Sequence, residues 1–389
     1  MYIKYLKLRN FRNYAELGLE LSAGLNTFLG PNAQGKTNVV EAVYYGSLGH
    51  SHRTRADKEL IRWGQDGALI EIVFVSGGVE RRLEFQLSQT ARRRILLNGA
   101  PVRPRELVGN LNTVLFSPED LWLVKGAPAG RRRFLDAEIS QARPAYYKAL
   151  LEYNKIVTQR NSLLKSLREG HGDRSLLPLW DEQLARQAAL ITAHRLTAVR
   201  VLSRLAGSLQ RDIAGGEELT IAYELHGLND ARHIAGQSPG SLALLEQEGE
   251  NVTRALYSWY NKELESKREL DIIRGTTSRG PHHDDIVLAV DGRNLKAFGS
   301  QGQQRTGGLA LKLAEMEFLQ RETGEYPVLL LDDVMSELDV SRRRQLVDYI
   351  ARQHIQTLIT ATDKAYFPDG FRADGHAYSV RSGQVQQLQ

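Results

Sequence analysis

The sequence contains no cysteine and only three methionines among its 389 residues. Without cysteine there can be no disulfide, no thiolate metal site and no cysteine nucleophile. No uncharged apolar run approaches the roughly 18–20 residues that a membrane-spanning helix needs. The first ten residues carry charges where a secretory signal peptide needs an unbroken apolar segment. We therefore expect a cytoplasmic protein with no membrane partner.

Lysine is scarce among the basic residues. Of 51 basic residues, 13 are lysine and 38 are arginine, and they oppose 46 acidic residues to give a net charge of +5. Arginine binds phosphate groups through paired hydrogen bonds and keeps its charge when partly buried, so the excess suits contact with nucleic acid. The base composition of a genome produces the same bias without any function. Composition alone leaves both explanations open.

Both ends of the chain show strand patterns. In residues 68–102, apolar and polar residues alternate, and two glycine-containing turns interrupt the alternation. This pattern predicts an antiparallel meander. Pro327–Leu331 and Gln356–Thr360 are continuous apolar or β-branched runs, typical of buried parallel strands. We expect the fold class to be α/β, with residues 1–120 and 276–389 forming one discontinuous domain.

The middle of the chain has a helical period instead. From Pro144 to Arg211, apolar residues recur every three or four positions, and Glu169–Asp173 marks a helix stop and turn. A third helix is expected over Ser241–Leu270. We predict that residues 121–275 form an inserted helical domain built on an antiparallel helical hairpin.

A complete G-x-x-x-x-G-K-T sequence follows the expected strand at Leu25–Leu29 and opens an expected helix. Its residues are Gly30, Pro31, Asn32, Ala33, Gln34, Gly35, Lys36 and Thr37. This is the context of a P-loop, in which backbone amides and the helix N-terminus hold phosphates. Lys36 contacts the β- and γ-phosphates in such a site, and Thr37 offers its hydroxyl to Mg²⁺. The sequence therefore predicts a site for ATP and Mg²⁺.

Two carboxylates follow the apolar strand at Leu329–Leu331. In P-loop ATPases a carboxylate at the end of such a strand holds the magnesium ion, a role that we assign to Asp332. Asp333 would then orient or deprotonate the attacking water. The alternative is a strand that ends in two solvent-facing acids, and the P-loop favours the catalytic interpretation.

A glycine-rich helix start precedes Asp332 by about thirty residues. Ser300, Gly302 and Gln303 present a hydroxyl and bare amides there, which suits a γ-phosphate. Their order and spacing resemble the signature of ABC-type ATPases, and Ser336–Asp339 resembles the D-loop of the same class. A plain glycine-rich helix N-terminus is the alternative.

Together, these segments closely resemble the RecF family of bacterial replication-gap repair ATPases, relatives of the structural-maintenance-of-chromosomes heads. The segments that carry the resemblance are Leu8–Tyr14, Gly30–Asn38, Ser51–Thr54, Ser117–Leu121, Arg131–Asp136, Gly280–His282, Ser300–Gln303, Leu331–Asp333 and Ser336–Asp339. The match runs through nearly the whole chain.

The resemblance implies a fold and a mechanism. The fold would be an ABC-type ATPase head, with Arg12 and Asn38 added to the nucleotide-binding residues. Ser300, Gly302 and Gln303 of one copy would cap the ATP of another, giving an ATP-dependent homodimer that slow, DNA-stimulated hydrolysis releases. The family binds single-stranded, gapped and duplex DNA and helps to load RecA, with RecO and RecR as partners.

Two departures from related patterns matter. The family usually has Arg where this chain has His283, so a basic contact there is weakened or made pH-dependent. ABC transporters carry a His after their final strand, where this chain has Thr360–Asp363. Thr362 is our candidate for the γ-phosphate sensor, and with Lys36 and Asp333 it completes the predicted catalytic set.

Several arginines are candidates for contact with DNA, although charge runs are often solvated faces. They are Arg53, Arg55, Arg92, Arg93, Arg94, Arg103 and Arg105. The run Arg131–Arg133 is open to a structural or a nucleotide-coupling role. Pro281–Asp285 has the composition of a metal cluster, but its Gly-Pro-His frame also fits the RecF pattern.

Two other classes of protein are alternatives to a repair ATPase of the RecF type. A chromosome-organising scaffold ATPase would clamp DNA without a role in recombination, and it predicts long coiled-coil arms that the inserted region is too short to form. A soluble nucleotide-binding subunit of a transporter is disfavoured by the Thr-for-His replacement and by the helical hairpin.

Overall fold

The computed structural model describes residues 1–227, 250–363 and 375–388. The chain forms two compact units. The first comprises Met1–Trp122 and Gly308–Gln389, and the second comprises Leu123–Gly307. No helix in the described part of the chain is long and apolar enough to cross a membrane.

The first unit contains an antiparallel sheet of six strands in the order β2-β1-β4-β5-β6-β7. Its strands are β1 (Tyr2–Phe11), β2 (Tyr14–Glu20), β4 (Gly67–Ser76), β5 (Val79–Ser88), β6 (Arg94–Leu97) and β7 (Ala100–Pro101). Every second residue of β4 is buried, as expected for a strand with one face on the core. The predicted meander over 68–102 is confirmed.

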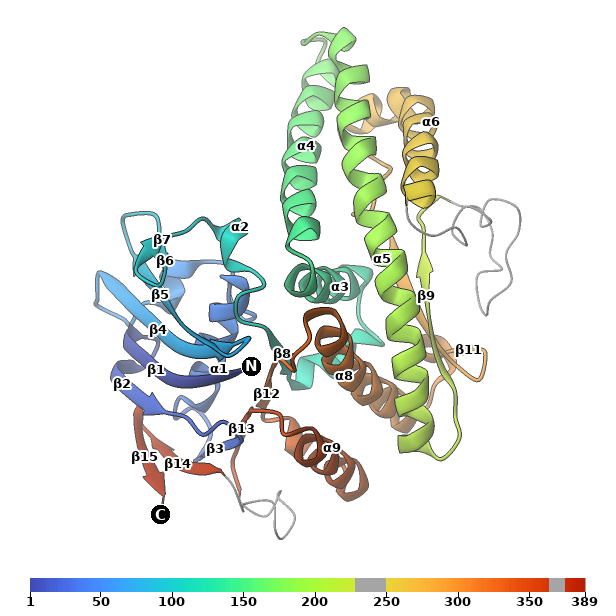
Figure 1. Cartoon of the computed structure of the whole chain (residues 1–389). Helices are drawn as coiled ribbons and strands as arrows, with labels where there is room; N and C mark the ends of the chain where they lie inside the picture. The colour runs from blue at the N-terminus through green and yellow to red at the C-terminus, as the bar shows by residue number, and fades with distance from the viewer. Residues whose placement is uncertain (228–249, 364–374, 389) are drawn as a thin grey trace. The chain divides into compact units, whose positions relative to one another are not determined.

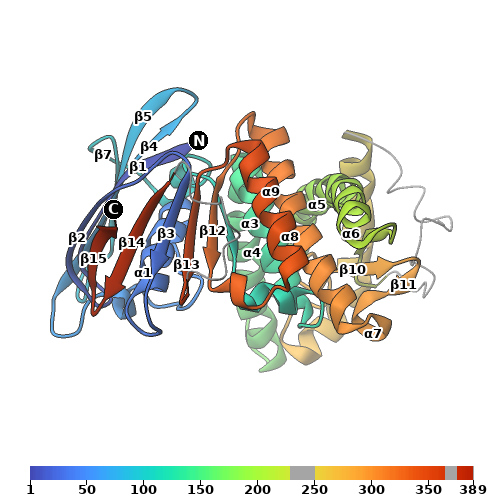
Figure 2. The ribbon, with the colours of Figure 1, turned by 90° about the horizontal axis from the view of Figure 1, so that it is seen from below.

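A second sheet of six strands has the order β15-β14-β3-β13-β12-β8 (Figure 2). Its strands are β3 (Leu25–Leu29), β8 (Thr113–Phe116), β12 (Val328–Asp332), β13 (Thr357–Ala361), β14 (His376–Arg381) and β15 (Gln384–Leu388). All neighbours pair in parallel except β14 and β15. Because β12 and β13 are buried along their whole length, the predicted parallel strands are confirmed.

One core joins these two sheets through helix α1 (Lys36–Leu48). Val39, Val40 and Val43 of α1 belong to the same buried cluster as Ile72 of β4 and Leu330 of β12. The other helical segments with residues in this unit are 3₁₀ turns at Asp57–Leu60, Pro118–Leu123 and Val334–Ser336, α2 (Pro104–Leu107), α8 (Gln301–Thr323) and α9 (Val340–Gln353). The α/β class is thus confirmed, with strands from both ends of the chain in one sheet.

The second unit is mainly helical. Its elements are α3 (Pro128–Ala142), α4 (Pro144–Arg168), a 3₁₀ turn at Arg174–Leu176, α5 (Leu177–Ala214), β9 (Leu219–Glu224), α6 (Glu250–Arg274), β10 (Asp285–Val290), β11 (Arg293–Asn294) and α7 (Leu295–Phe298). Helices α4 and α5 lie side by side as the predicted hairpin (Figure 1). The expected helix over 241–270 is present as α6, and residues 241–249 lie outside the described residues.

The second unit extends further along the chain than the predicted insertion. We expected the ATPase domain to resume at residue 276, whereas residues 276–307 belong to the helical unit. The reason is strand pairing: β10 pairs antiparallel with β9, from Asp285 opposite Glu224 to Val290 opposite Leu219. Arg131, which is 5% exposed, further attaches β10 to the second unit. It donates to both carboxylate oxygens of Asp285 over 2.8 and 2.7 Å.

A buried ionic cluster joins three helices of the second unit. Arg160 of α4 is fully buried and donates to Asp181 of α5 and to Asp271 of α6, over 2.8 Å in each case. Arg268 also donates to Asp181, over 2.6 Å. An arginine in this position is costly to desolvate, so its hydrogen bonds have to be made together with the helix packing.

We expect Arg160→Ala to lower the free energy of unfolding by about 3–5 kcal/mol, because it removes the ionic partner of the buried Asp271 and one of the two arginines that bind Asp181. Urea unfolding followed by circular dichroism measures the change. Arg186→Ala is the matched control: Arg186 is an exposed arginine paired with Glu182, and its loss should cost less than about 1 kcal/mol. Equal effects of the two variants would contradict a special role for Arg160.

Candidate nucleotide-binding site

The P-loop connects β3 to α1, and two of its glycines are required by the backbone. A Cβ atom at Gly30 would lie 2.2 Å from the carbonyl oxygen of Val380 in the neighbouring strand β14. Gly35 precedes α1 with a φ of 118°, a conformation that side-chain-bearing residues rarely adopt. The loop can therefore curl tightly, with its amides available for phosphate oxygens.

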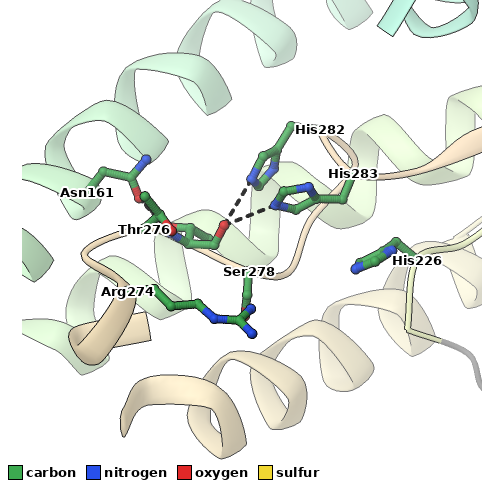
Figure 3. Close-up of a pocket in the computed structure, with 8 residues that line it drawn as sticks. Asn161, His226, Arg274, Thr276, Ser278, His282 and His283 are labelled. Atoms are coloured by element: carbon green, nitrogen blue, oxygen red, sulfur yellow. Dashed lines mark hydrogen bonds between the residues drawn. The ribbon is translucent and has the colours of Figure 1, made fainter. Parts of the chain in front are cut away.

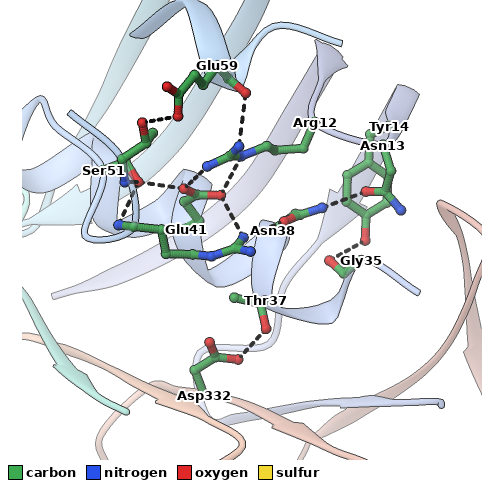
Figure 4. Close-up of polar contacts among 12 residues, drawn as sticks. Arg12, Asn13, Tyr14, Gly35, Thr37, Asn38, Glu41, Ser51, Glu59 and Asp332 are labelled. Carbon is green, nitrogen blue, oxygen red and sulfur yellow. Dashed lines mark hydrogen bonds and ion pairs between the residues drawn. The ribbon is translucent and has the colours of Figure 1, made fainter. Parts of the chain in front are cut away.

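Polar contacts from elsewhere in the first unit hold the outer side of this loop (Figure 4). The Tyr14 hydroxyl donates to the Gly35 carbonyl over 2.9 Å. The Asn13 amide donates to the Gln34 carbonyl, also over 2.9 Å. Asn38 donates to the Asn13 side chain over 2.8 Å. Asn13 and Tyr14 close the RecF-like segment at the start of the chain, so that segment supports the loop.

Lys36 lies within the curl of the loop. Its side chain is 4% exposed, and Nζ donates to the carbonyl oxygens of Gly30 and Pro31 over 2.8 and 2.9 Å. These carbonyls hold the ammonium group inside the loop, where it can meet an incoming phosphate. The remaining predicted residues, Asn32 and Ala33, complete the loop, and Ala33 has a positive φ of 63°.

A buried carboxylate lies beside the start of α1. The Thr37 hydroxyl donates to Asp332 Oδ1 over 2.9 Å, and the Thr360 hydroxyl donates to the same atom over 2.8 Å. Burial raises the pKa of Asp332, and the hydrogen bonds from Thr360 and Thr37 partly oppose this. Hydroxyl and carboxylate oxygens are the hard ligands that Mg²⁺ prefers, and Mg²⁺ usually takes few ligands from the protein. Thr37 and Asp332 therefore fit a magnesium ion.

Thr360 is a site residue that sequence reasoning missed. It is fully buried and opposes Asp332 in the parallel pairing of β13 with β12. Its hydroxyl oxygen also accepts the backbone N–H of Asp333 over 2.9 Å, so one threonine positions both predicted carboxylates. Thr362, our candidate for the phosphate sensor, follows β13 and is exposed.

Asp333 begins the turn that leaves the sheet. Its φ of 53° lies in the left-handed region, which is uncommon for a residue with a side chain. Such strain persists where surrounding contacts impose it and is frequent at functional sites. Its side chain is half-buried.

Glu41 of α1 anchors two arginines next to the P-loop (Figure 4). Arg12 donates to both of its carboxylate oxygens, over 2.9 and 2.6 Å, and Arg53 donates to it over 3.2 Å. Burial acts to raise the pKa of Glu41, but hydrogen bonds from Arg12 and Ser51 and the two arginine charges outweigh it and lower the pKa. Sequence reasoning did not single out Glu41, because its role is evident only from the arginines that bind it.

The predicted DNA-contacting arginines fall into two groups. Arg53 also donates to Asn38 of the P-loop helix over 2.9 Å, and Arg93 bonds to Tyr45, to the Gly49 carbonyl and to Asp57. These two are occupied by contacts within the first unit. Arg53 is nevertheless exposed, as are the members of the second group: Arg55, Arg92, Arg94, Arg103 and Arg105.

In the second unit, the signature-like segment forms a capping box at the start of α8. The Ser300 hydroxyl accepts the N–H of Gln303 over 3.1 Å, and the Gln303 side chain accepts the N–H of Ser300 over 2.9 Å. Gln303 also donates to Glu217 over 3.0 Å. Ser300 and Gln301 are exposed, whereas Gly302 and Gln303 are half-buried.

The alternative interpretation of Pro281–Asp285 as a metal cluster gains no support. Among the described residues, no group of three or more His, Asp or Glu side chains is placed to hold a metal ion. The Asp284 carboxylate instead accepts hydrogen bonds from the Tyr223 hydroxyl and the His226 backbone, over 2.6 and 2.9 Å.

Comparisons with known proteins find relatives over nearly the whole chain. The family described as "RecF/RecN/SMC N terminal domain" matches residues 2–383. A protein of Halothermothrix orenii named DNA replication and repair protein RecF is 44% identical over 93% of this chain and 92% of its own. The RecF of Geobacillus thermodenitrificans is 41% identical over 99% of both chains.

Solved structures give the same result. The structure of the recombination mediator protein RecF-ATPrS in the RecFOR pathway superposes with a TM-score of 0.88 at 32% identity, covering 100% of this chain and 98% of that one. An SMC head bound to the C-winged helix domain of ScpA has a TM-score of 0.55 at 15% identity, covering 100% and 98%, which shows a shared fold. The chain, with its ABC-type ATPase fold, therefore belongs to the RecF family.

Proposed function

We propose that this protein is an ATP-dependent DNA-binding protein of replication-gap and recombinational repair, in which ATP joins two copies and hydrolysis releases them. The observation that carries the proposal is the buried Asp332 carboxylate, held by the hydroxyls of Thr360 and of Thr37, the residue that follows the P-loop lysine. A relative of known structure is described as bound to ATP, which supports the same ligand here.

The residues of the first unit have separate roles in this proposal. The backbone N–H groups of Asn32–Thr37 and the ammonium group of Lys36 bind the phosphates, with Asn38 and the Glu41-anchored Arg12 at the side of the loop. Thr37 and Asp332 would hold Mg²⁺, which neutralises charge on the β- and γ-phosphates when bound. Asp333 orients the attacking water and accepts its proton, and Thr362 senses the γ-phosphate.

The signature-like segment provides the link to a second copy. Each chain has one P-loop and one helix start of this kind. The helix start at Ser300, Gly302 and Gln303 is suited to an anion, because the N-terminus of a helix favours negative charge and a phosphate could replace the contacts of the capping box. In a homodimer this segment caps the ATP of the partner, so the nucleotide holds the interface together. Loss of the γ-phosphate would then weaken the interface, and we expect slow turnover that DNA stimulates.

DNA binding is assigned to the exposed arginines of the antiparallel sheet and its neighbouring loops. Contacts of this type are made with phosphates, so binding should depend strongly on salt and weakly on sequence. The pathway named for the solved relative supports RecO and RecR as partners and loading of RecA as the outcome. A scaffold ATPase would need long arms, whereas α4 and α5 have 25 and 38 residues, about 38 and 57 Å.

Lys36→Ala should abolish ATP-driven dimerisation, because it removes the only ammonium group inside the described P-loop. Light scattering should show the wild-type mass doubling with ATP and Mg²⁺ while the variant stays monomeric. Lys58→Ala, which removes an exposed lysine from the 3₁₀ turn at Asp57–Leu60, is the control and should dimerise normally. A Lys36→Ala protein that dimerises with ATP would overturn the assignment of the phosphate site.

Thr360→Val should lower kcat for ATP hydrolysis about 10–100-fold and raise the Mg²⁺ concentration needed for half-maximal activity, because it frees a predicted metal ligand from its support. Thr362→Val is the matched variant. As a phosphate sensor, Thr362 should affect kcat and leave the Mg²⁺ requirement unchanged. The same Mg²⁺ requirement in Thr360→Val and wild type would count against the positioning role.

Replacing Arg92, Arg94, Arg103 and Arg105 with Gln should weaken duplex DNA binding. Each arginine that contacts a phosphate contributes about one to the slope of log affinity against log salt. Titrations at several salt concentrations should therefore show a shallower slope for the fourfold variant. Arg93→Gln, which breaks contacts within the protein, should leave the slope unchanged. An unaltered slope in the fourfold variant would place the DNA surface elsewhere.

A further inference from the structure

The second unit contains a pocket of about 340 Å³ that the proposed function does not use (Figure 3). It lies where the segment after α6 passes Asn161 of α4 and His226, which follows β9. Arg274, Ser278, His282 and His283 complete the lining that matters here. This volume is at the lower end of the range for small-ligand sites.

Several hydrogen-bond donors of this pocket have no partner in the described part of the chain. The Arg274 guanidinium makes no ion pair there, and the buried Ser278 hydroxyl makes no hydrogen bond. Asn161 uses its Oδ1 atom to accept from the Thr277 N–H and hydroxyl, over 2.8 and 2.7 Å, which leaves its amide hydrogens for a ligand. A buried hydroxyl without a partner costs free energy, so its presence calls for a ligand or water.

No carboxylate lines the pocket, and the nearest ones are already engaged. Asp271 accepts the Ser278 N–H over 3.0 Å, in addition to its bond from Arg160. Asp284 accepts from Tyr223 and from the His226 backbone. The charge that the lining side chains can present is therefore positive.

The three imidazoles of the pocket differ in how many of their ring nitrogens already make a hydrogen bond with described residues. His282 has both ring nitrogens engaged, one with the Tyr153 hydroxyl and one with the Thr277 carbonyl over 3.3 Å. His283 uses only Nε2, which lies 3.1 Å from the same carbonyl. The His226 ring makes no hydrogen bond with described residues. Burial, followed by the charges of His283 and Arg279, lowers the pKa of His226, and an anion in the pocket would offset that repulsion.

The wall of the pocket is preformed. Arg160 donates to the Thr277 hydroxyl over 2.9 Å, so the buried ionic cluster of the three helices also fixes the segment that carries Ser278. Gly280 has a φ of 144°, and a Cβ atom there would lie 2.1 Å from the Tyr153 hydroxyl. A fixed wall lowers the ordering cost of binding.

We propose that this pocket binds a compact oxyanion, either free phosphate or a terminal phosphate group, through the side chains of Arg274, Ser278, Asn161, His226 and His283. The guanidinium provides the charge, and its planar fork matches two phosphate oxygens. All the residues involved belong to the second unit and none to the P-loop, so the inference is independent of the proposed ATPase function.

Isothermal titration with inorganic phosphate tests the site. The titration uses full-length Lys36→Ala protein, which keeps the P-loop from contributing to the heat. Phosphate should bind, and Arg274→Gln in the same background should weaken binding at least tenfold. Arg254→Gln is the matched control, because Arg254 is exposed on the same helix, twenty positions or about 30 Å away. Ser278→Ala is a second variant and should weaken binding about threefold.

No binding of phosphate at millimolar concentration, or equal binding by the Arg274→Gln and Arg254→Gln proteins, would overturn the proposal. A 5′-phosphorylated dinucleotide and its unphosphorylated form separate the two sources of the anion. Tighter binding of the phosphorylated dinucleotide than of phosphate assigns the pocket to a nucleic-acid end. Tighter binding of phosphate assigns it to a free anion.

Discussion

The hydrogen bonds that Thr37 and Thr360 donate to one oxygen of Asp332 are the constraint on which the first unit depends. They connect three segments that are far apart in the chain: the start of α1 and the ends of β12 and β13. A buried carboxylate is stable only when hydrogen bonds satisfy it. The strands therefore have to meet in one register, which places the P-loop and the candidate metal ligands side by side.

Other contacts in the first unit hold the start of α1 and the ends of β12 and β13 rigidly together. Strands β12 and β13 are buried throughout, so sliding one along the other would expose apolar side chains and separate Thr360 from Asp332. On the other side of the loop, β14 approaches Gly30 so closely that no side chain fits there. Asn13 and Tyr14 complete the enclosure. The candidate nucleotide site is thus held by packing and by hydrogen bonds to its backbone, and Thr360 supports the carboxylate of Asp332.

Local patterns in the sequence were enough to predict the P-loop, the apolar strand before Asp332 and the hairpin of α4 and α5. Each is encoded within one stretch of chain by residue type and period. Strand β9 was missed because its six residues become a strand only by pairing with β10, some sixty residues away. Thr360 and Glu41 were missed for a related reason. Their importance depends on strand register and on which arginines reach them, and neither is visible from neighbours in the sequence.

The arginines also show that a local pattern in the sequence does not determine which contacts a side chain makes. The sequence leaves the arginine runs open between DNA contact and a solvated face, yet Arg93 is bound to Tyr45 and Asp57, and Arg160, outside any run, is fully buried. The capping box of Ser300 and Gln303 has a further consequence. A phosphate that takes the Gln303 N–H has to displace the Ser300 hydroxyl, an exchange that costs about 1 kcal/mol. Each helix start thus carries its own internal competitor, which in the proposed dimer would favour reversible association of the two copies over a permanent one.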